Sequence, residues 1–125
     1  MLDFTNKTII ITGASRGIGE ASANYFSNLN ANVVLAARSK SKIAEIADKL
    51  GKNALAIECN VADPTQVNNL MVKSSKVFGT IDVLINNAGI SMRALVSEVS
   101  VQTLQNVMDI NFWGTVYCTK AALAS

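Results

Sequence analysis

The sequence contains no histidine, and this absence removes a large group of possible sites. Catalysis by an imidazole base and metal centres built on histidine ligands are both excluded. Only two cysteines occur, Cys59 and Cys118, and they lie too far apart to match the spacing of metal ligands. We expect both cysteines to be buried packing residues, and we predict no metal site.

A long apolar run and a strong charge of either sign are also missing. The chain has no run of about 18 apolar residues, so no membrane-spanning helix is predicted. Its first residues lack the basic and then apolar layout of a signal peptide. The formal net charge of +2 is too small to indicate nucleic acid or a membrane surface as a partner. A reducing, cytoplasmic setting is the default expectation.

The most informative feature that is present is a glycine-rich stretch, Thr12-Gly13-Ala14-Ser15-Arg16-Gly17-Ile18-Gly19, directly after an apolar run. Glycines at this spacing permit a tight turn, close approach to a ligand and close packing of helix on strand. The helix that follows offers free N–H groups and the positive end of its dipole to a pyrophosphate. A simple glycine-rich turn is the alternative, but the flanking strand and helix favour nucleotide binding. The predicted ligand residues are Gly13, Ser15, Arg16, Gly17, Ile18 and Gly19.

Short apolar runs at 7–12, 32–37, 53–58 and 81–85 alternate with stretches of helical period. Helices are predicted from 17, over 43–50, over 64–78 after an Asp63-Pro64 start, and from about 100. In the first of these, Ile18, Tyr25, Phe26 and Leu29 fall on one face. This alternation predicts an α/β fold: a doubly wound (Rossmann) parallel sheet with strand order 3-2-1-4 and helices on both faces. We expect one dinucleotide-binding domain over 1–125.

Two further motifs join the glycine stretch, Asn86-Asn87-Ala88-Gly89 after the fourth strand and Asn111 in the last helix. Together the three resemble the short-chain dehydrogenase/reductase family over the whole chain. The resemblance implies an oxidoreductase that moves a hydride between a nicotinamide cofactor and a carbonyl or alcohol carbon. It also implies a catalytic role for Asn111, which would help to hold a water and the proton relay. Asn87, Ala88 and Gly89 are expected beside the nucleotide crevice, although such residues also favour ordinary turns.

The end of the second strand indicates which cofactor is bound. An acid near this position selects NAD by accepting hydrogen bonds from the ribose hydroxyls, but here the strand ends Ala37-Arg38. Arg38 and Arg16 are suited to a 2′-phosphate, so we predict NADP (NADPH), with two solvated surface arginines as the alternative. After the third strand, Asn60 replaces the family's usual acid, and its amide oxygen can accept from the adenine amino group. Val61 would pack on the adenine ring or belong to the core.

The family's remaining catalytic groups are a serine, a tyrosine and a lysine four residues after the tyrosine, and these normally follow the asparagine. Tyr117 and Lys120 are spaced by three and share the helix of Asn111, so we expect a packing residue and a solvated charge. The chain therefore looks truncated before the catalytic segment, and we expect it to be inactive alone. The alternatives to a parent NADP-dependent reductase are a non-catalytic NADP-binding module and a half that needs a complementing chain.

Partners are expected on two surfaces. The family commonly uses the helix of Asn111 at a subunit interface, so we predict a homo-oligomer through the last helix. Strand four would be an exposed apolar edge. The stretch 90–95 either borders the substrate, with Met92 and Leu95 as an apolar wall, or forms a surface loop. The substrate is predicted to be a small carbonyl or alcohol compound of unspecified identity.

Overall fold

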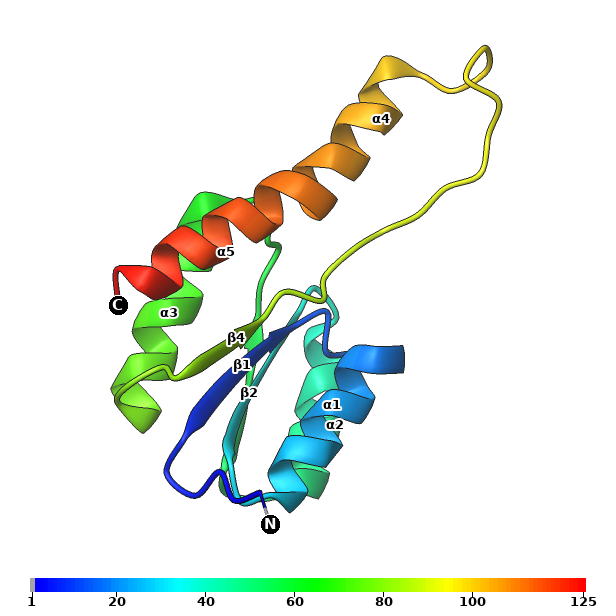
Figure 1. The fold of residues 1–125 in the computed structure, drawn as a ribbon. Helices are drawn as coiled ribbons and strands as arrows, with labels where there is room; N and C mark the ends of the chain where they lie inside the picture. The colour runs from blue at the N-terminus through cyan, green and yellow to red at the C-terminus, as the bar shows by residue number, and fades with distance from the viewer. Residues whose placement is uncertain (1) are drawn as a thin grey trace.

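The computed structural model describes residues 2–125, in which strands and helices alternate (Figure 1). The strands are β1 (Thr8–Thr12), β2 (Asn32–Ala37), β3 (Ala54–Glu58) and β4 (Val83–Ile85). The helices are α1 (Gly17–Asn28), α2 (Lys40–Leu50), α3 (Pro64–Phe78), α4 (Val101–Met108), the π-helical segment η1 (Asp109–Trp113) and α5 (Gly114–Leu123).

The four strands form one parallel sheet in the order β3-β2-β1-β4, as the sequence predicts. Ile10 at the centre of β1 is level with Val34 of β2 and Leu84 of β4. Helices α1 and α2 cover one face of the sheet, and α3 with α5 covers the other (Figure 1). The doubly wound α/β architecture is therefore confirmed.

The core is split into two layers by the sheet, because successive side chains of a strand point to opposite faces. Ile9 and Ile11 pack toward α1 and α2, where Ile43 lies, whereas Ile10 packs toward Leu70 of α3 and Cys118 of α5. Every residue of β1 is buried. The two central strands thus fix the sheet, and the loops after their carboxyl ends are held in place by this rigid core.

The start of α3 follows the predicted capping pattern with one difference. Asp63 caps the helix by accepting the Thr65 N–H at 2.9 Å, and Pro64 occupies the first turn. Gln66 does not reach back to the Asp63 N–H; its Oε1 accepts the Asn60 N–H at 2.8 Å instead. The inner face of the helix is formed by Val67, Leu70 and Met71, which are buried.

The predicted inner face of α1 is wrong in part. Ile18 is 77% exposed and Tyr25 is 53% exposed, whereas Gly19 and Ala23 are buried. Phe26 is half-buried and packs on Phe4 with the ring centroids 5.3 Å apart. Gly19 and Ala23 face inward because α1 lies close to the loops after β1 and β4 at Gly19, and Ile18 and Tyr25 point outward.

The C-terminal helices form one continuous rod. Ser100 caps α4 by accepting the Thr103 N–H at 3.1 Å, as predicted for a helix that begins near this residue. The rod contains a π turn in which the Gly114 N–H donates to the Asp109 carbonyl. Figure 1 shows α5 over α3, whereas α4 and the preceding stretch without regular structure extend beyond the sheet. No helix within 2–125 is both long and apolar enough to cross a bilayer.

Candidate functional site

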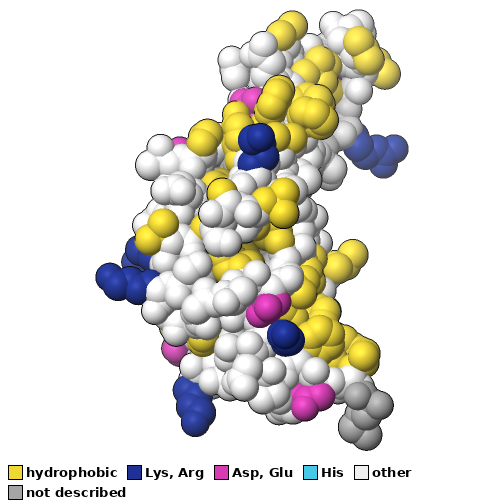
Figure 2. Space-filling view, turned by 60° about the vertical axis from the view of Figure 1, so that its left-hand side comes forward, with side chains coloured by type: hydrophobic (Ala, Val, Ile, Leu, Met, Phe, Trp, Pro, Cys, Tyr) yellow, Lys and Arg dark blue, Asp and Glu magenta, His cyan; other side chains and the backbone are white. Residues whose placement is uncertain are grey.

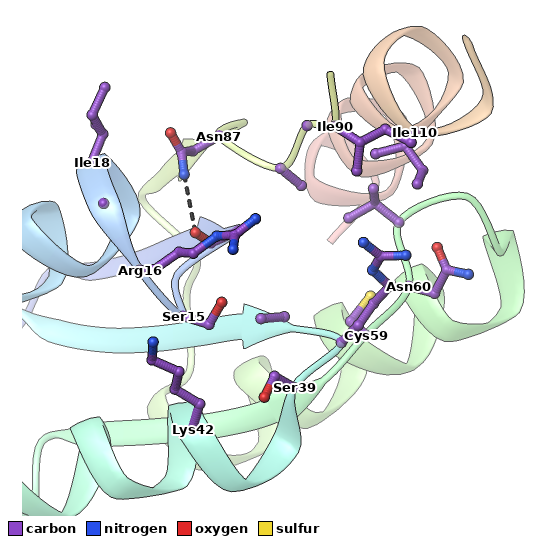
Figure 3. Close-up of a pocket in the computed structure, with 17 residues that line it drawn as sticks. Ser15, Arg16, Ile18, Ser39, Lys42, Cys59, Asn60, Asn87, Ile90 and Ile110 are labelled. Carbon is purple, nitrogen blue, oxygen red and sulfur yellow. Dashed lines mark hydrogen bonds between the residues drawn. The ribbon is translucent and has the colours of Figure 1, made fainter. Parts of the chain in front are cut away.

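A cavity of about 500 Å³ opens at the carboxyl ends of the strands (Figure 3). All four strands contribute the residues that follow them, which is where ligands bind in open parallel sheets. Eleven predicted ligand residues line it: Gly13, Ser15, Arg16, Gly17, Ile18, Arg38, Asn60, Val61, Asn87, Ala88 and Gly89. The sequence prediction thus brings together segments that lie far apart in the chain.

Gly13 shows why the loop after β1 requires glycine. Its φ is +63°, a backbone conformation that L side chains rarely adopt. A Cβ at Gly13 would lie 2.8 Å from the Cα of Ala88, so the loop after β4 leaves no room for a side chain. The two loops are therefore in backbone contact at the centre of the site.

Gly19 is the one predicted nucleotide ligand of the glycine stretch that does not line the cavity. It is buried in α1, and a Cβ there would lie 2.7 Å from Nδ2 of Asn87 and 2.9 Å from the Cα of Ala14. The residue therefore allows α1 to pack against the two loops. Gly19 thus acts on the shape of the cavity through the loops that line it and does not line the cavity itself.

Thr12 joins β1 to the loop after β4. Its Oγ1 accepts the N–H groups of Asn87 and Ala88, both at 3.0 Å. Asn87 in turn donates from Nδ2 to the Gly13 carbonyl at 3.1 Å, the dashed line in Figure 3. Thr12 is not among the ligand residues predicted from the sequence. A hydroxyl directly before the first glycine of the motif is the signal that could have found it.

The charge of the cavity is entirely positive. Arg16, Arg38 and Lys42 line it, and no carboxylate does. The sequence prediction missed Lys42, which points from the first turn of α2 toward the cavity together with Ser39 (Figure 3). Its position directly before the predicted helix over 43–50, four residues after Arg38, was a usable signal. Three cations without an acid favour an anion that carries more than one charge.

The loop after β3 supplies the other end of the cavity. Asn60 uses Oδ1 to accept the Ala62 N–H at 3.0 Å, and an amide oxygen retains a second lone pair for a ligand. Val61 lines the cavity and is buried beneath α5, a position compatible with either predicted role. Cys59 also lines the cavity, and burial, followed by the charge of Asp63, raises the pKa of its thiol to about 11. The thiol is therefore neutral near pH 7.

Asn111 lies outside the cavity lining and is held by the segment after β4. Its Oδ1 accepts the Ile90 N–H and its Nδ2 donates to the Ile90 carbonyl, both at 2.8 Å. The π turn carries this side chain, and π turns of this kind often occur at functional sites. Ile90 and Ile110 line the cavity on either side of this contact (Figure 3). Asn111 therefore positions the end of the site.

Three expectations about side chains near the cavity and in the core can be compared with the structure. Met92 and Leu95 do not line the cavity, and Leu95 is 65% exposed, so the surface-loop alternative fits them better. Tyr117 stacks on Trp113 with ring centroids 6.1 Å apart, as expected of a packing residue. Both cysteines are buried and free, and no cluster of three or more His, Cys, Asp or Glu side chains suited to a metal occurs within 2–125.

The shape and chemistry of the cavity fit a dinucleotide. The glycine loop brings backbone close to the ligand at the N-terminus of α1, where a diphosphate is stabilised. Apolar side chains of Val61, Ile90 and Ile110 offer surfaces for rings at its two ends. The three cations Arg16, Arg38 and Lys42 exceed the number needed to neutralise the charge of a diphosphate alone.

Comparison with known proteins shows the family that the sequence motifs resemble. The family model described as short chain dehydrogenase matches residues 7–125. A meso-2,3-butanediol dehydrogenase of Serratia marcescens is 39% identical over 121 residues, which is 96% of this chain and 48% of that protein. An uncharacterized oxidoreductase of Staphylococcus saprophyticus is 35% identical over 129 residues, with 100% of this chain and 55% of that protein covered.

A solved structure is similar over nearly the whole chain. A short-chain dehydrogenase/reductase of Brucella melitensis, described as a glucose/ribitol dehydrogenase, superimposes with a TM-score of 0.95 at 30% identity, covering 98% of this chain and 53% of that one. The chain thus spans about half the length of the relatives that it matches. Because the family model matches residues 7–125 of this chain, the chain belongs to the short-chain dehydrogenase family.

Proposed function

We propose that this chain binds NADP(H) as the cofactor-binding domain, 1–125, of a short-chain dehydrogenase/reductase. The observation that carries the proposal is the end of β2, where Ala37 and Arg38 stand at the cavity in place of an acid. An acid would repel a 2′-phosphate, whereas a guanidinium binds one through fixed, charged donors. Arg16 and Lys42 add two further cations on the same cavity.

Each part of the cofactor has a matching set of residues. The glycine loop with Ser15, Gly17 and Ile18 would hold the diphosphate at the N-terminus of α1. Asn60 and Val61 would take the adenine, and Asn87, Ala88 and Gly89 would border the nicotinamide ribose. The bound nicotinamide supplies the hydride acceptor or donor. What the chain contributes is orientation: Thr12 and Asn111 fix the loop after β4 from two sides.

The reaction proposed for the parent protein is hydride transfer between NADPH and a small carbonyl or alcohol compound. Within 2–125 no tyrosine lines the cavity, so our proposal places the proton donor outside these residues. The relatives are about twice as long, which supports a catalytic serine, tyrosine and lysine in the half that this chain does not span. We expect the 125-residue chain alone to bind the cofactor without turnover.

The test is a calorimetric titration of the natural protein with NADPH and with NADH. We expect NADPH to bind at least about tenfold more tightly, since a hydrogen bond to a charged group contributes about 1.5–3 kcal/mol. Equal affinities would contradict the proposal. The intact mass of the natural protein should be measured first. A mass of 13.3 kDa predicts binding without turnover, and a mass about a hundred residues larger predicts NADPH oxidation by a panel of carbonyls.

We also propose that the C-terminal rod joins two copies of the chain. Side chains of Leu104, Met108, Phe112 and Trp113 are 44–51% exposed, and Figure 2 shows hydrophobic side chains gathered on the upper part of one face. An apolar surface of this kind is typical of an interface. Light scattering of the natural protein should give a multiple of the chain mass, and a monomer would contradict this part of the proposal.

A further inference from the structure

A second groove, of about 610 Å³, lies along the outer edge of the sheet. Its floor is β3 and one wall is a stripe on α3 made of Gln66, Asn69, Lys73, Lys76 and Val77. Lys40 at the start of α2 closes the other side. The groove shares no lining residue with the cofactor cavity, so it is a separate site.

The backbone of β3 leaves a row of hydrogen-bonding groups facing this groove. In the described part of the chain β3 pairs only with β2. The Val33 N–H donates to the Asn53 carbonyl and the Cys59 N–H donates to the Ala37 carbonyl, which sets the parallel pattern between them. In a parallel pair every second residue directs its N–H and carbonyl to the same neighbour, so Leu55 and Ile57 bond to β2. The N–H and carbonyl of Ala56, the Ala54 carbonyl and the Glu58 N–H therefore point outward. A further strand can therefore add here.

The charges around the groove indicate the kind of strand. Lys40, Lys73 and Lys76 line it against a single acid, Glu58. Across residues 2–125 the one ion pair joins Lys49 and Glu45, so none of the groove lysines has a carboxylate partner. Because α3 runs back along β3, Lys73 and Lys76 lie toward the start of the strand and Lys40 toward its end. Positive charge thus stands at both ends of the groove.

The side chains between these charges are small or apolar. Ala56 on the floor leaves space, and Leu55 is half-buried beside Val77, which is 57% exposed. Successive residues of an added strand point to opposite sides. Acidic residues on the α3 side of the added strand would reach Lys73 and Lys76, and the apolar residues between them would lie over Ala56 on the α2 side.

We propose that the edge of β3 binds an extended acidic segment of a partner protein by strand addition. Main-chain hydrogen bonds supply the affinity in this mode, and alternate side chains supply the specificity. Sheet edges are also commonly protected by lysines, which keep other chains away. The two roles make opposite predictions, because a protective lysine lowers the affinity for any added strand and a recognition lysine raises it for an acidic one.

The test measures fluorescence anisotropy of labelled eight-residue peptides added to the natural protein. The probe alternates Glu and Val. One control peptide carries Lys in place of each Glu, and a second carries Pro in place of each Val, which removes N–H donors. We expect the probe to bind, more weakly at high salt, and neither control to bind. Equal binding of the proline peptide would overturn strand addition, and no binding of the probe or equal binding of the lysine peptide would overturn the proposal.

Variants then locate the site. Lys73→Ala with Lys76→Ala should weaken probe binding about fivefold, as expected for the loss of two exposed ion pairs. The matched control is Lys7→Ala with Lys120→Ala, which removes two exposed lysines that line neither cavity. An equal loss in both variants would overturn the assignment of the groove. Binding of NADPH should be unchanged in both variants, so a failure here is distinguishable from a failure of the proposed function.

Discussion

The side-chain amide of Asn111 makes a closed pair of hydrogen bonds with the backbone of Ile90, one accepted and one donated, both at 2.8 Å. These bonds tie the segment after β4 to the π turn of the C-terminal rod. Ile90 also lines the cofactor cavity, so these hydrogen bonds link the rod directly to a residue of the cavity wall. The asparagine that the family resemblance marks as catalytic thus has both of its side-chain polar atoms hydrogen-bonded to Ile90 in this structure.

Replacement of Asn111 by Ala should loosen this segment. A hydrogen bond stabilises the folded state by about 0.5–1.5 kcal/mol, so its loss should accelerate amide exchange at Ile90 about fivefold or more. Hydrogen exchange followed by mass spectrometry measures this. Asn106→Ala is the matched control, since Asn106 accepts from Gln102 on the same rod and does not contact Ile90. Unchanged exchange at Ile90 in Asn111→Ala would contradict the positioning role.

Thr12→Val should destabilise the protein although the two side chains have nearly the same shape. The change leaves the N–H groups of Asn87 and Ala88 without their acceptor, at about 1–3 kcal/mol for each buried group. Thr12→Ser keeps the hydroxyl and is the control. Urea unfolding should show a clearly lower free energy of unfolding for Val than for Ser. Equal values would mean that the hydroxyl contributes nothing to joining the loops.

Arg38→Asp should shift nucleotide preference from NADPH toward NADH. The change removes a donor to the 2′-phosphate and supplies an acceptor for the ribose hydroxyls. Titration with both nucleotides should show NADPH affinity falling about tenfold or more. Arg93→Asp makes the same charge change outside the cavity and should leave the ratio unaltered. The same ratio in both variants would refute the assignment of Arg38 to the phosphate.

Much of this site could be predicted because its signals are local in the sequence. The glycine stretch, Arg38 and Asn87-Ala88-Gly89 each follow a recognisable strand, and the ends of parallel strands meet at one edge of a sheet. Strand order followed from the alternation of strands and helices. Residues at strand ends were therefore placed correctly without any knowledge of contacts.

The errors arose where packing distance decides the outcome. Ile18 and Tyr25 are large apolar residues of α1, yet the helix approaches its neighbours so closely that Gly19 and Ala23 form its buried face. The π turn around Asn111 leaves no mark on the periodicity, because one extra residue shifts the pattern by less than a turn. The roles of Thr12 and Lys42 at the cavity depend on the direction in which each side chain points. That direction is set by neighbours that are distant in the sequence.

The two thiols should make stability fall at alkaline pH. Burial raises the pKa of Cys59 to about 11 and that of Cys118 to about 12, from a usual value of 9.0. A raised thiol pKa means that the folded state favours the neutral form, so this contribution is complete below pH 9.0 and is lost as pH rises toward the folded values.

Urea unfolding across this alkaline range measures the effect. The free energy of unfolding should fall less steeply with pH in a Cys59→Ala, Cys118→Ala variant than in the natural protein. This comparison cancels the titration of tyrosines and lysines. Near pH 8 both thiols should also react slowly with iodoacetamide until the protein is unfolded, because the thiolate is the nucleophile. Rapid labelling of the folded protein would contradict the burial of both groups.

Gly114→Ala gives the sharpest test of how α5 is seated. Alanine normally stabilises a helix by about 1 kcal/mol relative to glycine. Here, however, the added Cβ would lie 2.5 Å from Cγ2 of Val61, so we expect net destabilisation of about 1–3 kcal/mol. Val61→Ala alone should also destabilise, because it opens a gap beneath the helix. The double variant should be more stable than the sum of the two single changes predicts, since each relieves the defect of the other. Additive changes would mean that Gly114 and Val61 are not in contact and that α5 sits farther from the loop after β3.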